Sequence, residues 1–378
     1  MNSPAADTAP SSKNRILFTL ISVGLGLTIA FVLAEWGLGY YFRQIQSQSM
    51  DPGLIQYHAQ LGWNLGPNWS GRHQHYDYEV RYSTGSNSFR NQTQPDNAAL
   101  AERQTVAVLG DSFTFGLGVN DDETFVSRLN AGNGPAFTNY AIPGTSTDQQ
   151  FLLMRSLQAR NAPEQVLLVV YLPNDILDNT LEYPLQAEQA KPIFRLSGSG
   201  NLELDNTPVP LVAKPALMRS TTLGSLVLNG FDAGGSLLDS TQVGRLLSTV
   251  IGGSSYTAEE LRPVLERNLQ DALTLFAALL DEFASEAARQ QAGLTIALLP
   301  GRDAMVNRSG ISFHYQDYLR EKILLLLADK GIASIDLMSA IGSDPNAEIS
   351  DLYFPNDGHL TPAGHNYVAE ILGRQFSL

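Results

Sequence analysis

From Thr105 onward, short apolar runs alternate with longer segments whose apolar residues recur at helical spacing. This alternation is typical of a parallel sheet, because the chain must cross back over the sheet before each new parallel strand. The expected strands are Thr105–Leu109, Ala136–Ala141, Gln165–Leu172, Leu294–Leu299 and Ala333–Met338, and the expected helices are Glu123–Asn130, Thr147–Arg160, Ala258–Gln290, His314–Lys330 and a last one from Pro362. The pattern predicts an α/β fold, a three-layer α/β/α sandwich around a five-stranded and mainly parallel sheet.

Several of these helices carry recognisable end signals. Thr257 and Glu260 have the spacing of a capping box, in which each side chain binds the backbone of the other residue. Gly331 can end a helix in the left-handed conformation. Thr361 followed by Pro362 predicts an N-cap with proline at the first helical position.

Two parts of the chain depart from the alternating pattern. Residues 42–104 are expected to form a linker and a small extension, in which the alternating aromatic run His75–Tyr82 predicts short strands. Within the main domain, residues 105–378, a proline-rich insertion occupies about 179–256, and a hairpin is expected around Ser197–Gly200. The insertion leaves the carboxyl end of the third strand, so it either covers a site there or only decorates the surface.

The N-terminal segment is apolar enough to cross a membrane. Residues 16–41 carry one charged side chain, and an uninterrupted apolar helix of that length spans a bilayer. Lys13 and Arg15 stand before it, which predicts a cytoplasmic tail over 1–15 and an extracytoplasmic position for the rest of the chain, periplasmic in a Gram-negative bacterium. The alternative is a signal peptide that is cleaved after Ala34.

Composition narrows the classes of partner and cofactor. The 24 basic and 38 acidic side chains give a formal charge of −14, which argues against non-specific binding to nucleic-acid phosphates. The chain has no cysteine, so disulfides and thiolate metal sites are excluded. His73, His75 and Asp77 would share one face of a strand, but a polar strand face is the commoner explanation. We therefore expect no metal and no organic cofactor.

A serine follows the first expected strand, in the sequence Gly110-Asp-Ser-Phe113. In an α/β fold this position can project a nucleophilic hydroxyl above the sheet edge, although a serine there can also merely cap the next helix. A serine nucleophile needs a base, normally histidine. Of the six histidines, His359 stands directly before the last helix near the same edge, with Asp357 two residues ahead of it.

Four blocks of residues resemble the SGNH, or GDSL-like, hydrolase superfamily over roughly Thr105 to the C-terminus, and the N-terminal segment points to a membrane-anchored, extracytoplasmic branch. The blocks are Gly110–Phe113, Asn139–Gly144, Leu172–Asp175 and Asp357–His359. The resemblance implies a flavodoxin-like sheet, Ser112 as nucleophile and His359 as general base and then general acid. It also implies that the developing oxyanion is bound by the Ser112 and Gly144 backbone amides and by the Asn174 side-chain amide. Asp357 would orient His359.

One departure from the family pattern concerns this aspartate. The best-known last block places aspartate three residues before the histidine, where this chain has Asn356. A spacing of two also occurs in related membrane-anchored groups, which favours Asp357. Asp351 is the lesser candidate, and a serine–histidine dyad supported by a backbone carbonyl is the third possibility.

These expectations predict a serine esterase that works through an acyl-serine intermediate. By resemblance, its substrates are acyl esters, particularly acetyl esters, of envelope polysaccharides or membrane lipids. Transfer of the acyl group to a sugar hydroxyl would instead make the protein an O-acyltransferase. The chain differs here from the alginate-acetylation branch, which places the acid and base before the serine. A non-catalytic binding or scaffold protein with a vestigial site is the alternative from another class.

Overall fold

The computed structural model of the chain describes residues 12–45, 48–90, 103–132, 134–157, 163–184, 187–212 and 257–376. The chain divides into two compact units, and helix α1 (Ser12–Ile45) belongs to the smaller one. Within α1, the segment Ile21–Tyr41 is long and apolar enough to cross a membrane, by length and composition alone. A membrane span and a signal sequence both have these properties.

The larger unit is built on a five-stranded sheet in which each pair of neighbouring strands is parallel. Its strands are β6 (Thr105–Leu109), β7 (Ala136–Asn139), β8 (Gln165–Tyr171), β11 (Gly293–Leu299) and β12 (Ala333–Asp336), in the order β12-β11-β8-β6-β7. The predicted α/β fold is confirmed. The order of connection reverses between β6 and β8, and such a switch point opens a crevice at the carboxyl ends of the strands.

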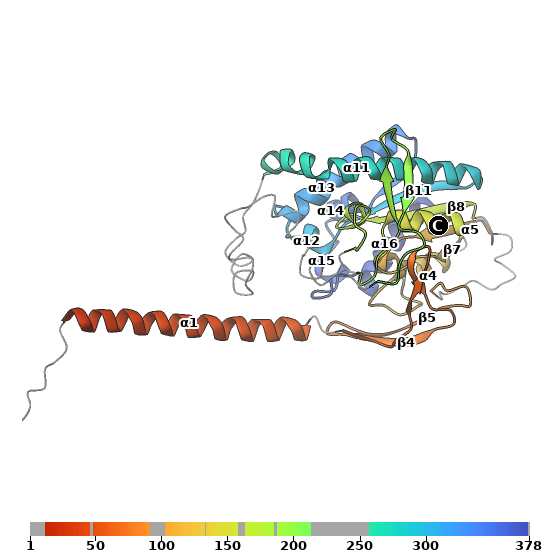
Figure 1. Ribbon diagram of the computed structural model, residues 1–378. Coiled ribbons are helices and arrows are strands. Elements are labelled where there is room, and N and C mark those ends of the chain that lie inside the picture. The colour runs from red at the N-terminus through yellow and green to blue at the C-terminus, as the bar shows by residue number, and fades with distance from the viewer. Residues whose placement is uncertain are drawn as a thin grey trace, which may run out of the picture. The chain divides into compact units, whose positions relative to one another are not determined.

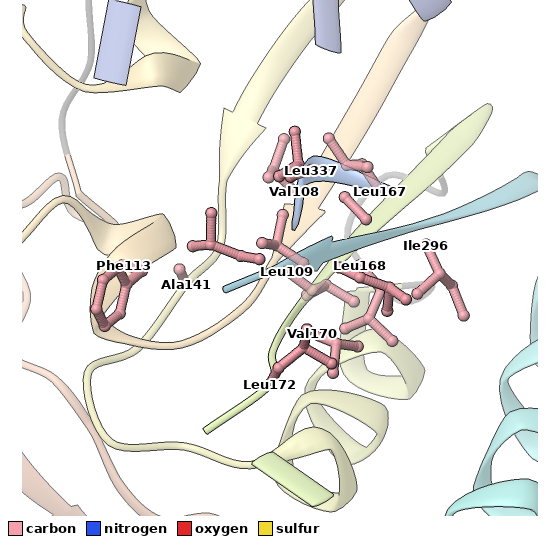
Figure 2. Close-up of a cluster of buried hydrophobic side chains, with 14 of the residues drawn as sticks. Val108, Leu109, Phe113, Ala141, Leu167, Leu168, Val170, Leu172, Ile296 and Leu337 are labelled. Atoms are coloured by element: carbon pink, nitrogen blue, oxygen red, sulfur yellow. The ribbon is translucent and has the colours of Figure 1, made fainter. Parts of the chain in front are cut away.

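The core of the sheet consists of aliphatic side chains from its central strands. Val108, Leu168 and Ile296 come from β6, β8 and β11, and none of the three is accessible to solvent. Figure 2 shows these side chains gathered along the strands, together with Leu337, the first residue of the helix that follows β12. Each fully buried side chain of this size contributes about 1.5–3 kcal/mol. The packed strands therefore give the loops at their carboxyl ends a rigid base.

The helices around the sheet form two groups, according to which of them contact one another. Helix α11 runs along one side of the sheet in Figure 1 and contacts α5, α13 and β11, whereas α16 contacts α4, α14 and α15. The helices are α3 (Ser112–Phe115), α4 (Phe125–Asn130), α5 (Thr147–Leu157), α6 (Asp175–Asp178), α11 (Ala258–Arg289), α12 (Arg302–Val306), α13 (Ile311–Asp329), α14 (Leu337–Ser343), α15 (Ile349–Leu352) and α16 (Pro362–Gln375).

The predicted end signals of these helices are confirmed. Thr257 and Glu260 form both hydrogen bonds of a capping box at the start of α11. Gly331 lies just beyond α13 with φ +65°, and Thr361 caps α16, whose first residue is Pro362.

Some predicted boundaries are wrong by a few residues. Leu337 and Met338 belong to α14 rather than to the last strand, because the Asp336 side chain accepts a hydrogen bond from the Ser339 N–H and caps a helix there. Helix α13 begins at Ile311, three residues before the predicted start. The last residues of the predicted helix Thr147–Arg160 lie outside the described part of the chain.

The extension forms short antiparallel strands in the larger unit. These are β1 (Gln48–Met50), β2 (Ile55–His58), β3 (Gly62–Leu65), β4 (Ser70–His75) and β5 (Glu79–Ser83), paired as β1-β4-β5 and β2-β3. The aromatic run His75–Tyr82 does not form one strand, since a turn at residues 76–78 separates β4 from β5. Tyr78 and Tyr82 are buried, so the extension packs as part of the core.

The described part of the insertion contains the predicted hairpin. Strands β9 (Ile193–Leu196) and β10 (Leu202–Asp205) pair antiparallel around the turn at Ser197–Gly200. The remainder of the insertion, residues 185–186 and 213–256, lies outside the described residues.

Candidate active site

Ser112 directly follows the tight turn of Gly110 and Asp111 that connects β6 to α3. A side chain at Gly110 would collide with the Thr114 side chain, because an added Cβ would lie 2.2 Å from Thr114 Oγ1. The Asp111 carboxylate then accepts a hydrogen bond from the Phe113 N–H at 2.9 Å and caps α3. Ser112 is thus the first residue of α3, at the carboxyl end of β6 and next to the switch point.

The hydroxyl of Ser112 contacts the imidazole of His359. Ser112 Oγ lies 2.8 Å from His359 Nε2, and His359 Nδ1 lies 2.6 Å from Asp357 Oδ1. A carboxylate only accepts, so Nδ1 carries the proton and Nε2 accepts from the serine hydroxyl. The Phe113 ring packs on His359 with centroids 4.4 Å apart, which restricts tilting of the imidazole. The arrangement allows Ser112 to be deprotonated as it attacks a carbon atom.

Asp357 is held in its ionised form. Burial alone raises the pKa of this carboxyl, but hydrogen bonds from the His359 ring, the interaction with the His359 charge, and hydrogen bonds from the His359 N–H and the Tyr78 hydroxyl outweigh burial and lower it to about 2. Asp357 therefore carries a full negative charge at neutral pH. That charge stabilises the imidazolium that forms when His359 takes a proton.

The other carboxyl candidate, Asp351, and the residue at the position of the best-known family aspartate, Asn356, have other partners. Asp351 is an exposed residue of α15, and its backbone carbonyl accepts a hydrogen bond from the Thr361 hydroxyl. Asn356 directs its side-chain amide to Asp77 at 2.7 Å. The partner of His359 Nδ1 is a carboxylate oxygen, that of Asp357, rather than a backbone carbonyl.

The three expected oxyanion donors differ in whether they already donate to a protein acceptor. In the described part of the chain, the backbone amides of Ser112 and Gly144 donate to no protein acceptor, so both are available to a ligand. Gly144 has φ +76°, a conformation that disfavours any side chain. The Asn174 side-chain amide instead donates to Asp178 Oδ2 at 2.9 Å, and its own oxygen is buried without a partner.

A cavity of about 490 Å³ opens over Ser112. Ser112, Gly144, Asp357 and His359 line it together, whereas Asn174 is not among its lining residues. The other lining residues are Gln48, Met50, Ile55, Trp63, Leu117, Pro143, Ala187, Glu188 and Gln189. The insertion therefore reaches the cavity with its segment 187–189.

Sequence reasoning missed the contribution of the extension to this cavity. Trp63 of β3 donates its indole N–H to the Pro143 carbonyl at 2.9 Å and so lies against the loop that holds Gly144. Gln48 and Met50 of β1 and Ile55 of β2 complete that wall. The alternating pattern indicated strands here, but no local signal indicates which distant loop a strand will contact.

His73 and His75 take part in protein hydrogen bonds. His73 Nδ1 lies 2.8 Å from the Tyr82 hydroxyl and its Nε2 lies 3.1 Å from Gln48 Oε1, while His75 Nδ1 accepts from the Asp77 N–H at 3.2 Å. Among the residues that the structure describes, no group of three or more histidine, cysteine, aspartate or glutamate side chains is arranged to hold a metal ion.

Comparison with known proteins gives one family match. Residues 106–372 match the model of a family described as GDSL-like lipase/acylhydrolase. No curated protein matches the chain.

Solved structures of distant similarity were also found. A member of the lipolytic G-D-S-L family from Veillonella parvula is 15% identical, with a TM-score of 0.36, 72% of this chain covered and 98% of that one. A psychrotrophic esterase from Pseudoalteromonas sp. is 11% identical, with a TM-score of 0.37 and coverages of 72% and 97%. A lipase/acylhydrolase from Enterococcus faecalis is 12% identical, with a TM-score of 0.37 and coverages of 72% and 94%.

Proposed function

Because the chain belongs to the GDSL-like lipase/acylhydrolase family and is therefore an acyl-ester hydrolase, we propose that Ser112 is its nucleophile, His359 its general base and Asp357 the residue that orients the base. The observation that carries this proposal is the 2.8 Å contact between Ser112 Oγ and His359 Nε2. Both atoms face one cavity, so a substrate carbonyl that enters it meets an activated hydroxyl.

The first half of the reaction forms an acyl-serine. His359 Nε2 takes the proton of Ser112 Oγ while that oxygen attacks the ester carbonyl carbon. The carbonyl electrons move onto oxygen, and the tetrahedral oxyanion accepts hydrogen bonds from the Ser112 and Gly144 amides. The carbon–oxygen bond to the alcohol then breaks, and the leaving alcohol takes the proton from His359.

The second half uses water as the nucleophile. His359 takes a proton from water, the resulting hydroxide attacks the acyl carbon, and Ser112 leaves with that proton while the free acid departs. Asn174 is the third proposed oxyanion donor. One of its two amide protons binds Asp178, and the proposal assigns the other one to the oxyanion.

The cavity supports a substrate with a small acyl group and a polar alcohol portion. Met50, Ile55 and Leu117 give one part of the wall apolar character suited to an acyl chain, and Gln48 and Gln189 offer hydrogen bonds to an alcohol portion. The proposed substrates are acetyl or other short acyl esters of envelope glycans, or lipid esters held near the membrane. We propose no metal and no organic cofactor in this reaction.

The location of the substrate follows from the proposed topology. Residues 16–41 anchor the chain, 1–15 stay in the cytoplasm, and 42–104 connect the anchor to the catalytic domain at 105–378, with its insertion at about 179–256. Gln48, a cavity residue, follows the end of α1 by only three residues.

The full chain, solubilised from membranes in mild detergent, tests this function. It is offered a short-chain nitrophenyl ester and an acetylated glycan, with and without an unacetylated acceptor sugar, and Ser112→Ala is the control. Hydrolysis predicts free acetate whose release needs Ser112. Acetylated product that forms only with acceptor would replace hydrolysis by transfer, and failure of a fluorophosphonate probe to label the wild-type serine would favour a non-catalytic protein.

A further inference from the structure

A turn of the extension contacts the loop that precedes α16. The turn joins β4 to β5 and consists of Tyr76, Asp77 and Tyr78. The Asp77 carboxylate accepts hydrogen bonds from the backbone N–H groups of Asn356 at 2.9 Å and Asp357 at 2.8 Å, and from the Asn356 side-chain amide at 2.7 Å. The Tyr78 hydroxyl donates to Asp357 Oδ2 at 3.1 Å. Two adjacent residues of one turn thus bind the same distant loop.

The turn is itself held firmly in place. The His75 N–H donates to the Tyr78 carbonyl at 2.8 Å, and the Tyr78 ring stacks on the His75 ring with centroids 5.2 Å apart. The Tyr78 ring also contacts the Phe354 ring, with centroids 5.1 Å apart. The Asp77 side chain is only 4% exposed. A packed turn of this kind can transmit a fixed position to the loop it contacts.

These contacts engage both oxygens of the Asp357 carboxylate. Oδ1 faces His359 Nδ1 at 2.6 Å and Oδ2 accepts from Tyr78. Burial raises the pKa of the Tyr78 hydroxyl far above its usual value, so the hydroxyl stays protonated and donates. With a partner on each oxygen, the carboxylate plane has one orientation, which keeps Oδ1 directed at the imidazole.

We propose that Asp77 and Tyr78 are positioning residues of the esterase, which hold the backbone and the carboxylate of Asp357 so that His359 faces Ser112. Neither Asp77 nor Tyr78 lines the cavity, so they act through Asp357 rather than on the substrate. The inference rests on the proposed function, because Asp357 needs a fixed orientation only if His359 is the base. The extension is then part of the catalytic apparatus and not only a connection to the anchor.

Tyr78→Phe tests the hydroxyl while leaving the ring packing unchanged. In the full chain we expect kcat for a nitrophenyl ester to fall about tenfold with KM unchanged, because a hydrogen bond to a charged group is lost away from the substrate. Tyr76→Phe is the matched control: this tyrosine belongs to the same turn, is 66% exposed, and should keep wild-type kcat.

Asp77→Ala tests the hydrogen bonds that Asp77 accepts from the backbone of Asn356 and Asp357. Removing three acceptor interactions frees the loop at residues 356–357, and a displacement of about 1 Å at a catalytic group costs on the order of a hundredfold in kcat. Asp77→Asn retains an acceptor oxygen for the two backbone N–H groups, so most of the activity should return. Glu79→Gln controls for loss of an acidic group nearby, since Glu79 is exposed and pairs with Arg72.

A double-mutant cycle separates positioning from general packing. If Tyr78 acts through Asp357, then Tyr78→Phe adds no further loss of kcat in an Asp357→Ala background. The inference is overturned if Tyr78→Phe and Asp77→Ala keep wild-type kcat at an unchanged Tm, or if the Tyr78→Phe loss persists undiminished in that background. A wild type without turnover and without Ser112-dependent probe labelling overturns the proposed function itself, and this inference with it.

Discussion

At the scale of single residues, the geometry of the site depends on the hydrogen-bond partner of each polar atom. The Asp357 carboxylate keeps its negative charge beside the imidazole, and each of its two oxygens accepts a hydrogen bond, one from the His359 ring and one from the Tyr78 hydroxyl. Asn356, which stands where the best-known family pattern has the aspartate, is occupied instead by Asp77. Because the Asn356 side chain binds Asp77, the residue whose carboxylate contacts the base His359 is Asp357.

A prediction at this scale compares two aspartates. Asp357→Asn should lower kcat by about ten-thousandfold, because an amide can hold the imidazole in the wrong tautomer. Asp351→Asn should leave kcat within a factor of about two, since Asp351 is an exposed residue without contact to His359. Steady-state kinetics of both variants decide this. The opposite pattern, with Asp351→Asn inactive and Asp357→Asn active, would refute the assignment of the acid.

At the scale of secondary-structure elements, short turns and helix starts place the reactive groups. Helix α3 begins after a two-residue turn that follows β6, so the Ser112 amide is one of the first N–H groups of a helix and lacks an internal partner. The loop before α16 is closed by the Tyr353–Leu360 bridge, and Thr361 caps the helix that follows. α16 in turn packs on α4, which anchors the His359 loop to the core.

The contact between α16 and α4 contains a titratable group. His365 is fully buried, and its Nδ1 accepts a hydrogen bond from the Phe125 N–H at 3.1 Å. Burial is the main cause that lowers the pKa of His365, and the nearby charges of Arg90, His359 and Arg128 act in the same direction, so that together they bring it from 6.5 to about 3. The folded protein therefore holds His365 neutral where the unfolded chain protonates it.

This depressed pKa predicts how stability depends on pH. Since the unfolded state binds more protons between pH 6.5 and about 3, the contribution of His365 is complete above pH 6.5 and is lost as pH falls toward 3. Between pH 7 and pH 5 the loss is about 2 kcal/mol. Thermal unfolding of the full chain should show a larger fall in Tm over this interval for wild type than for His365→Asn.

For wild type and for His365→Asn, the quantity compared is the fall in Tm between pH 7 and pH 5. His365→Asn also loses the packing of the imidazole on Phe125, so its Tm is expected to be lower at both pH values. His73, whose burial lowers its pKa to about 4, titrates in both proteins and leaves a residual acid sensitivity. Equal falls in Tm for wild type and variant would show that His365 does not titrate as described.

At the scale of the whole molecule, the cavity is built from three parts of the sequence. The main domain supplies Ser112 and His359, the extension supplies Trp63, and the insertion supplies Gln189. The extension also begins directly after the apolar helix, so the same segment that forms one cavity wall leads to the proposed anchor. This continuity is the structural reason to propose substrates in the cell envelope.

A prediction at this scale concerns the fate of the apolar helix. If residues 16–41 are an anchor, protein extracted from membranes keeps its complete N-terminus, and an alkaline carbonate wash leaves it in the membrane fraction. Mass spectrometry of the intact protein measures this directly. A mature N-terminus just after Ala34 would show a cleaved signal peptide instead.

The strand–helix alternation was predictable because hydrophobic periodicity is local. The apolar runs that became β6, β8 and β11 were identified to within a residue at either end, since buried parallel strands need continuous apolar side chains. The end of β12 was misplaced, because Asp336 can cap a helix and the run Leu337–Met338 is apolar in either structure. The catalytic assignments from Ser112 and His359 remain predictions to be tested by kinetics.

The sequence by itself determined the class of fold, the turn that holds Ser112 and the apolar N-terminal helix, since each depends on residues that are close together in the chain. Only the tertiary structure decided that Asp357 rather than Asp351 faces His359, and that Asp77 and Tyr78 hold its loop. Tyr78 and Asp357 are 279 residues apart in the sequence. Contacts between such distant residues follow from how strands and helices pack, which no local pattern encodes.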